Sequence, residues 1–305
     1  MTFVLLLEQI LNGLQFGVML FLMAAGLTLI FGVMGLINLA HGSLYMIGAF
    51  AAAAAASATG SFLIGLAAAL GAAALAGALV ERLVIRRLYQ RDHLDQVLAT
   101  FALILIFSEA TRWAFGSFPL YLDVPPWLSG PVSLPFGIDY PAYRLALIGV
   151  GLTIAALLFL LIARTRLGVQ IRAGEADREM IAALGVDIDR LYLHVFALGA
   201  ALAALAGALI GALQSVQVGM GEPVLILAFV TIVIGGIGSI RGALVGAILV
   251  GVTDTLGRTL LPVVFGWVMD PAAATTVGAS LASMAIYILM AGVLVVRPRG
   301  LFGTV

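Results

Sequence analysis

The stretch INLAHGSLYMIGAF, residues 37–50, sets three polar side chains inside a long apolar segment. They belong to Asn38, His41 and Ser43. Where a chain unwinds at membrane depth, its amides and carbonyls need partners that lipid does not offer, so it is tolerated only against protein or a water-filled cavity. The stretch therefore predicts a helix break inside a membrane-spanning bundle, with polar side chains that can serve the unwound backbone.

The composition on either side places the chain in a membrane. Of its 305 residues, 63% are hydrophobic and 10% are charged, and the mean hydropathy is +1.19. Uncharged runs at 145–163, 195–221 and 272–296 approach or reach the ~20 residues that an α-helix needs to cross a bilayer. We expect an all-α, polytopic membrane protein with one transmembrane domain over residues 1–305. The net charge of zero indicates no electrostatic preference for nucleic acid.

The distribution of arginine predicts the topology. All 15 basic residues are arginine, and most lie in Arg82–Arg91, in Arg164–Arg190, or in the tail at Arg297 and Arg299. Because basic residues concentrate in cytoplasmic loops, these segments are expected inside the cell. The proline-rich residues 116–143, which hold no arginine, are expected to form an extracytoplasmic loop. The protein is then a multi-pass membrane protein, with its N-terminus outside and its C-terminus inside.

Segment lengths predict eight spans, although seven to ten would fit. The region 224–275 must enter the membrane and return, because a span that ends inside has to follow it. Two full crossings or two half-helices would both satisfy that requirement. The other expected spans are three before Glu81, one near Val97–Phe115, one at Arg144–Ala163, one from Arg190 to about Leu213, and one at Thr276–Val296.

One expected span carries small residues at four-residue spacing, namely Gly199, Ala203, Gly207 and Gly211. Rows of small residues let helix backbones approach one another closely in membranes. We expect this row to pack against neighbouring helices, and we assign it no chemistry.

Two glycine-interrupted segments match when they are aligned. GLINLAHGSL (35–44) and GGIGSIRGAL (235–244) share Gly35/Gly235, Ile37/Ile237, Gly42/Gly242 and Leu44/Leu244 without a gap. Paired interrupted segments in corresponding halves indicate the pathway of a transporter built from repeats. The alternative is that His41 is a hydrogen-bonded residue of the helix break that touches no solute. Arg241, which aligns with His41, should face a cavity, an interface or a membrane surface, because an unpaired charge is costly in lipid.

The most charged stretch runs from Arg164 to Arg190. Glu175, Asp177 and Glu179 are expected in the first turns of a helix that Gly185 ends, since acidic residues suit a helix N-terminus and glycine suits its end. Its apolar side would hold Met180, Ile181 and Leu184. Such a helix can be a solvated loop element, lie on lipid headgroups, or insert into a groove of a partner.

Several kinds of chemistry are absent from the sequence. A phosphate-binding loop of the G-x-x-x-x-G-K-[ST] type requires lysine, and the chain has none. There is no cysteine and no H-E-x-x-H motif, so we expect no catalytic residue, metal site or cofactor in this chain. An ion-coupled secondary transporter would need carboxylates or histidines within the membrane, whereas Glu8, Glu109, Glu222 and Asp254 lie near span ends. Such a carrier or a passive channel remains the alternative, because a shift of the span boundaries by one turn would bring these residues inside.

Three motifs resemble one known family. They are GLTLIFGVMGLINLAHGSLYMIGAF (26–50), RAGEADREMIAALGVDIDR (172–190) and AFVTIVIGGIGSIRGALVGAILVG (228–251). Their order and spacing are similar to those of the permeases of branched-chain amino acid ABC importers, the LivH/LivM group, and NLAHGSLYMIGA is closer to the LivH type.

The resemblance implies a transport subunit that pairs with a second, LivM-like permease. Two ATPase subunits would use ATP and magnesium, and an extracytoplasmic binding protein would deliver the solute. Family substrates include leucine, isoleucine and valine, while relatives carry urea, short amides or aromatic acids. The implied translocation residues are Asn38, His41, Gly42, Ser43, Gly235, Gly236, Gly238, Ser239, Arg241 and Gly242, and the implied coupling residues are Arg172, Gly174, Glu175, Asp177, Arg178, Glu179 and Gly185.

Overall fold

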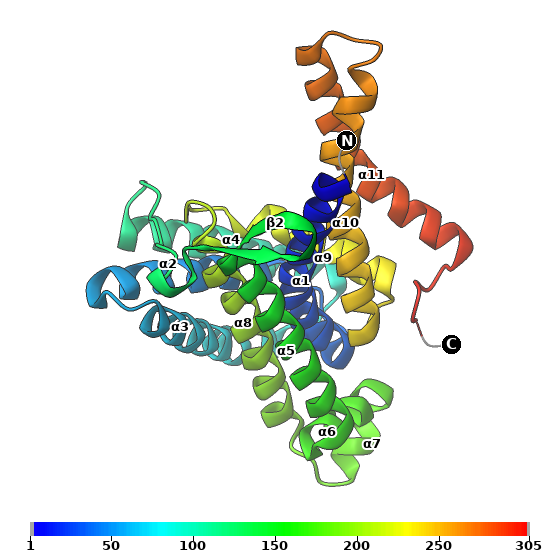
Figure 1. Ribbon diagram of the computed structural model, residues 1–305. Coiled ribbons are helices and arrows are strands. Elements are labelled where there is room, and N and C mark those ends of the chain that lie inside the picture. The colour runs from blue at the N-terminus through cyan, green and yellow to red at the C-terminus, as the bar shows by residue number, and fades with distance from the viewer. Residues whose placement is uncertain (1–2, 304–305) are drawn as a thin grey trace. The chain divides into compact units, whose positions relative to one another are not determined.

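The protein is almost entirely helical in a computed structural model that describes residues 3–303 (Figure 1). A short antiparallel hairpin pairs Pro131 with Pro141 and precedes α5. The elements are α1 (Phe3–Met34), α2 (His41–Thr59), α3 (Phe62–Leu83), η1 (Ile85–Arg87), α4 (His93–Phe115), η2 (Pro126–Leu128), β1 (Pro131–Leu134), η3 (Pro135–Gly137), β2 (Ile138–Pro141), α5 (Ala142–Arg164), α6 (Arg166–Ala176), α7 (Arg178–Ala183), α8 (Ile188–Gly211), α9 (Gly221–Gly235), α10 (Ile240–Phe265) and α11 (Pro271–Val296).

Eight helices in the described chain are long and apolar enough to cross a membrane, which confirms the predicted number. They are α1, α2, α3, α4, α5, α8, α10 and α11. Helix α9 has 15 residues, about 22 Å of helix, which is shorter than the ~30 Å hydrocarbon core. The region 224–275 contains the end of this short helix, the second break and the long helix α10. The choice between two crossings and two half-helices stays a prediction.

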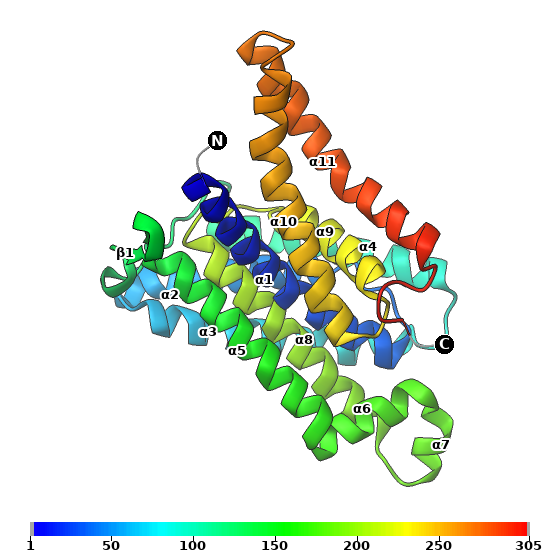
Figure 2. The same ribbon diagram turned by 45° about the vertical axis from the view of Figure 1, so that its right-hand side comes forward.

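The chain divides into two compact units, whose boundaries fall within α1, α5 and α9. The first unit holds residues 3–21, 126–152 and 227–303. In this unit α10 and α11 pack as a helical hairpin (Figure 2). Helix α1 approaches α10 closely, since a Cβ atom on Gly17 would lie 2.7 Å from the carbonyl oxygen of Ala247. The glycine there permits backbone contact between the two helices.

The second unit holds residues 22–125 and 153–226, and α2, α3 and α8 pack against one another in it. The predicted small-residue row lies where α8 packs against α1 and α2. A Cβ atom on Gly199 would lie 2.9 Å from the carbonyl oxygen of Gly26, and Gly207 lies directly against the backbone of Tyr45. This confirms that the row serves close packing.

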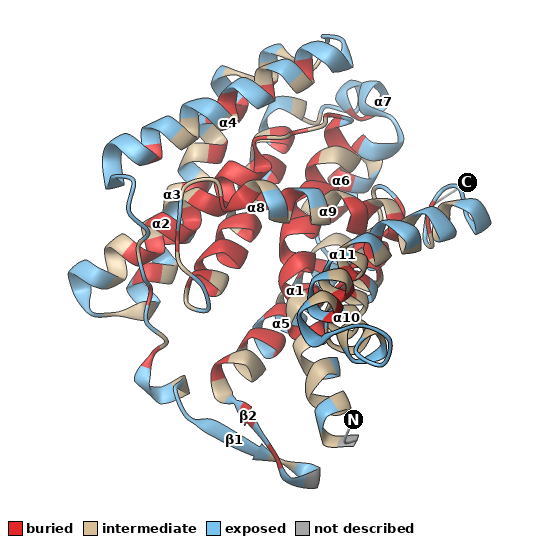
Figure 3. Ribbon diagram, turned by 90° about the horizontal axis from the view of Figure 1, so that it is seen from above, coloured by how far each residue is buried: buried red, intermediate tan, exposed pale blue. Residues whose placement is uncertain are grey.

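Burial differs between the helices (Figure 3). Much of α1, α2 and α8 is buried, whereas α4, α10 and α11 leave many apolar side chains exposed. Trp113 of α4 is 91% exposed and Val295 of α11 is 84% exposed. Because water would disfavour such surfaces, they suit contact with lipid or with another membrane subunit.

Candidate translocation site and coupling segment

The first break separates α1 from α2 and spans residues 35–40. Gly35 has a φ of +65°, and its N–H donates to the carbonyl oxygen of Phe31 at 2.8 Å. A glycine with positive φ just after a helix is a common helix terminator, because other residues meet steric strain there. The break overlaps the predicted stretch at Asn38, whereas His41 and Ser43 lie in the first turn of α2 rather than in unwound chain.

Polar side chains at this break are buried. Asn38 and His41 are 0% exposed and Ser43 is 2% exposed. Within residues 3–303 the side-chain amide of Asn38, both ring nitrogens of His41 and the Ser43 hydroxyl complete no hydrogen bond, although the imidazole lies against the Met23 backbone. A buried polar group without a partner costs about 1–3 kcal/mol. The geometry therefore favours a polar partner from outside the chain, such as water or a solute, at this place.

Gly42 lies where the start of α2 meets the start of α9. A Cβ atom at Gly42 would lie 2.9 Å from the carbonyl oxygen of Gly221, the first residue of α9. Any larger side chain would push the two backbones apart. The contact between the two helices therefore requires glycine at this position.

The second break separates α9 from α10 and lies in the first unit. Gly236 and Gly238 have φ values of +102° and +83°. The Ser239 hydroxyl accepts a hydrogen bond from the N–H of Gly242 at 3.0 Å and so caps α10. Gly242 lies directly against Gly235, the last residue of α9, and Arg241 is exposed. The aligned glycines thus occupy corresponding positions, each in the first turn of the helix that follows a break.

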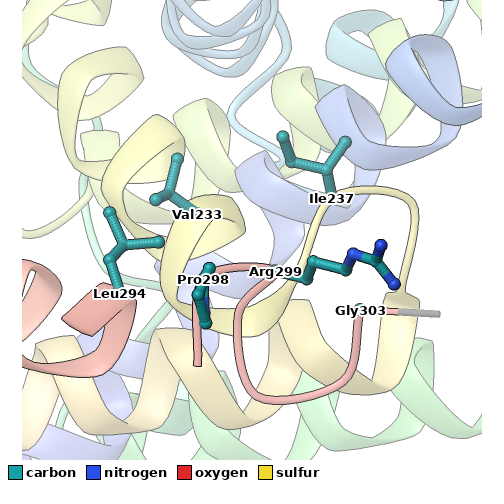
Figure 4. A pocket seen from close by; sticks show the side chains of 6 residues that line it. All are labelled: Val233, Ile237, Leu294, Pro298, Arg299 and Gly303. Atoms are coloured by element: carbon teal, nitrogen blue, oxygen red, sulfur yellow. The ribbon is translucent and has the colours of Figure 1, made fainter. Parts of the chain in front are cut away.

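The C-terminal tail also contacts the second break, and no pattern in the sequence predicts this contact. The N–H groups of Leu301 and Phe302 donate to the carbonyl oxygens of Ile234 and Gly235, both at 2.9 Å. A pocket of about 320 Å³ lies beside this contact (Figure 4). Its lining residues, from α9, the break, α11 and the tail, are Val233, Ile237, Leu294, Pro298, Arg299 and Gly303.

The predicted single helix of the charged segment is wrong. Asp177 interrupts it with a φ of −158°, so that Glu175 lies at the end of α6 and Glu179 lies in the first turn of α7. The Asp177 carboxylate accepts hydrogen bonds from the N–H groups of Glu179 and Met180, both at 2.9 Å. Aspartate competes with the helical backbone in this way and is favoured at helix starts. Gly185 follows α7 with a φ of +88°, as its predicted role as terminator requires.

Helices α6 and α7 lie beyond the ends of α5 and α8 (Figures 1 and 2). Ile181 is buried, whereas Met180 is 60% exposed and Leu184 is 76% exposed. Partial burial raises the pKa of Glu175 above its usual value. Gly174 is buried, Arg172 donates to the carbonyl oxygen of Ile162, and Arg178 and Glu179 are exposed. The segment therefore offers apolar side chains among charged ones.

Comparison with known proteins identifies the family. The model of the family described as branched-chain amino acid transport system / permease component matches residues 9–296. The chain belongs to this permease family. The high-affinity branched-chain amino acid transport permease LivH of Escherichia coli K12 is 30% identical over 315 residues, covering 99% of this chain and 96% of its own. The corresponding permease BraD of Pseudomonas aeruginosa is 31% identical over 265 residues, covering 82% and 86%.

A solved inward-facing metal-chelate type ABC transporter covers 94% of the permease and 85% of its own chain, with 19% identity and a TM-score of 0.48. That likeness is too low to carry an argument. The family membership confirms the resemblance seen in the three motifs. The permease is a multi-pass membrane protein and a transport subunit of an ABC importer, and ATP hydrolysis in such a system belongs to a separate subunit.

Proposed function

We propose that the permease forms half of the translocation pathway for a branched-chain or other hydrophobic amino acid, or for a related small solute such as urea, an amide or an aromatic acid. Its partners would be a second, LivM-like permease, two ATPase subunits that use ATP and magnesium, and an extracytoplasmic binding protein. The similarity to LivH and BraD over most of the chain supports this assignment.

One observation carries the proposed pathway: the buried and unpartnered polar groups of Asn38, His41 and Ser43 at the first break. They provide an amide, an imidazole and a hydroxyl. The two buried acidic residues of the described chain are paired elsewhere, Glu81 with Arg86 and Asp254 with Arg258. The three groups at the break are neutral polar groups, which suits a solute without net charge such as a zwitterionic branched-chain amino acid. The half-buried Glu222 at the start of α9 is the nearby carboxylate.

The segment Arg172–Gly185 is the proposed contact with the ATPase subunits. The exposed Met180 and Leu184 would fill an apolar groove, and the surrounding charges would set the orientation. The concentration of arginine in these segments supports a cytoplasmic location for this contact and for the C-terminus. Residues 116–143 and the N-terminus would then lie outside.

Uptake by the reconstituted complex tests the proposal. The permease, its partner permease and both ATPase subunits are placed in lipid vesicles, and the binding protein is added with labelled leucine, isoleucine, valine, urea or benzoate. We expect ATP-dependent uptake of one of these solutes, and no uptake with an ATPase subunit that binds but does not hydrolyse ATP. Equal uptake with and without ATP hydrolysis would contradict the assignment.

A further inference from the structure

A buried carboxylate lies at the end of α3, outside both breaks. Glu81 is 0% exposed, and Arg86 of η1 donates to its two oxygens from Nε and Nη2, each at 3.3 Å. The Tyr89 hydroxyl donates to the same carboxylate at 2.8 Å. Burial, reinforced by the bond to Glu81, raises the pKa of Tyr89, so the phenol stays protonated and remains a donor. The Glu81 carboxylate thereby accepts hydrogen bonds from two residues that follow α3.

Arg86 also reaches α8. Its Nη1 lies 3.1 Å from Oδ2 of Asp189, and its Nη2 lies 3.4 Å from the Asp189 carbonyl oxygen. Asp189 is in the first turn of α8, which follows α7 after residues 184–187. The Asp189 side chain is 60% exposed, whereas that of Glu81 is fully buried. One side of Arg86 is therefore anchored, and the other forms a pair that can exchange with water.

The same cluster touches the end of α1. The Tyr89 hydroxyl lies 4.0 Å from the sulfur of Met34, the last residue before the first break, and the Tyr89 ring packs edge-on against Tyr192 of α8 at 4.9 Å. A Cβ atom on Gly174 of α6 would lie within van der Waals distance of Val33 and Leu191. Within this unit, α6 therefore lies close to the end of α1, and the start of α8 is connected to that end through Tyr89.

We propose that Arg86 is a positioning residue that links the coupling segment to the first helix break, with Glu81 and Tyr89 as its anchor and Asp189 as its movable partner. The inference rests on the proposed contact between residues 172–185 and the ATPase subunits. A displacement of α6 and α7 moves the start of α8, and the Arg86–Asp189 pair transmits that movement to Tyr89 and Met34. Loss of this pair should then reduce transport more than it reduces the stability of the fold.

The substitution Asp189→Asn tests the link, because it removes one charge at an exposed position and leaves Glu81 compensated. In the reconstituted complex we measure solute taken up per ATP hydrolysed, together with the thermal unfolding temperature. We expect the ratio to fall by roughly three- to tenfold, the scale of coupling changes in contact networks, with little change in unfolding. Asp189→Glu, which keeps the carboxylate, should restore most of the ratio.

Asp95→Asn is the matched control, since Asp95 is exposed, follows the same arginine-rich segment and has no ion pair within the described residues. Its ratio should equal that of the wild type. If Asp189→Asn leaves the ratio of solute taken up to ATP hydrolysed unchanged, with or without a loss of thermal stability, this inference is overturned and the proposed function is not. A wild-type complex that takes up no solute on ATP hydrolysis would overturn the proposed function, and this inference with it.

Discussion

Single glycines decide how closely the backbones meet beside the breaks. Gly42 faces the carbonyl of Gly221, and Gly242 faces that of Gly235, so that a side chain at either position has no space. Overpacking of a tight contact costs about 1–3 kcal/mol, or it moves the helices. These positions therefore link a residue-scale constraint to the shape of the proposed pathway.

Substitution of these glycines should strongly reduce uptake. We expect Gly42→Leu and Gly242→Leu to reduce ATP-dependent uptake at least tenfold, because a strain of about 1.4 kcal/mol already corresponds to a factor of ten. Labelled-solute uptake is the measurement. Gly71→Leu is the control, since nothing lies within 4 Å of its Cβ position. Wild-type uptake in both variants would refute the assigned role.

A similar prediction concerns Gly300 in the C-terminal tail. Its φ is +81°, and a Cβ atom would lie 2.5 Å from the N atom of Gly236. We expect Gly300→Ala to displace the tail from α9 and to lower the free energy of unfolding by about 1–3 kcal/mol, because the last α9 carbonyls lose their donors. Thermal unfolding in detergent measures this. Gly292→Ala, which has open space at its Cβ position within α11, should not lower the midpoint, because alanine favours a helix more than glycine does.

At the scale of elements, α6 and α7 form a jointed segment. Asp177 caps α7, so its substitution would change local structure as well as charge, whereas Glu175 makes no such bond in the described chain. The roles predicted for these two residues can therefore be distinguished. Substitution of Glu175 tests the surface charge alone, whereas substitution of Asp177 also tests the break between α6 and α7.

We expect Glu175→Arg to reduce solute-stimulated ATP hydrolysis in the assembled complex severalfold, because a reversed charge opposes docking of the segment. Circular dichroism should show unchanged helix content. Asp92→Arg serves as the control, since Asp92 precedes α4 and its side chain makes no capping bond. Normal solute-stimulated ATP hydrolysis in Glu175→Arg would show that Glu175 is not part of the contact. Asp177→Arg should be more severe, since it also removes the α7 cap, worth about 1 kcal/mol.

At the scale of the whole molecule, the permease consists largely of helices long enough to span a membrane, and its sequence lacks one common nucleotide-binding motif. It contains no lysine and therefore no phosphate-binding loop of the G-x-x-x-x-G-K-[ST] type. The exposed apolar faces of α4, α10 and α11 suit lipid or a second permease. Both features agree with a subunit that works within an assembly.

The purified permease alone should not accumulate solute against a gradient. Vesicles that contain only this subunit, with an imposed ion gradient and labelled leucine inside and outside, should reach equal concentrations or show no flux. Vesicles with the complete complex and ATP should accumulate the solute. Uphill accumulation by the single subunit would instead establish an ion-coupled carrier, the alternative that the sequence left open.

Part of the structure was predictable from the sequence. Composition and uniform hydrophobicity identify the eight spans, because a helix that crosses lipid must satisfy its own backbone and present apolar side chains along ~20 residues. Glycine at 35 and 185 marks helix ends for an equally local reason, since positive φ is easily reached only without a side chain. The three motifs were enough to predict the family.

The remaining features were decided by the tertiary structure, because they depend on contacts between residues far apart in the chain. The bond from Arg86 to Asp189 joins residues 103 positions apart, and the tail reaches α9 across more than sixty residues. The joint at Asp177 depends on a balance between a side-chain cap and a continuous helix, which are close in energy. Helical pattern and hydropathy describe the spans, whereas such partners are brought together only when the helices pack.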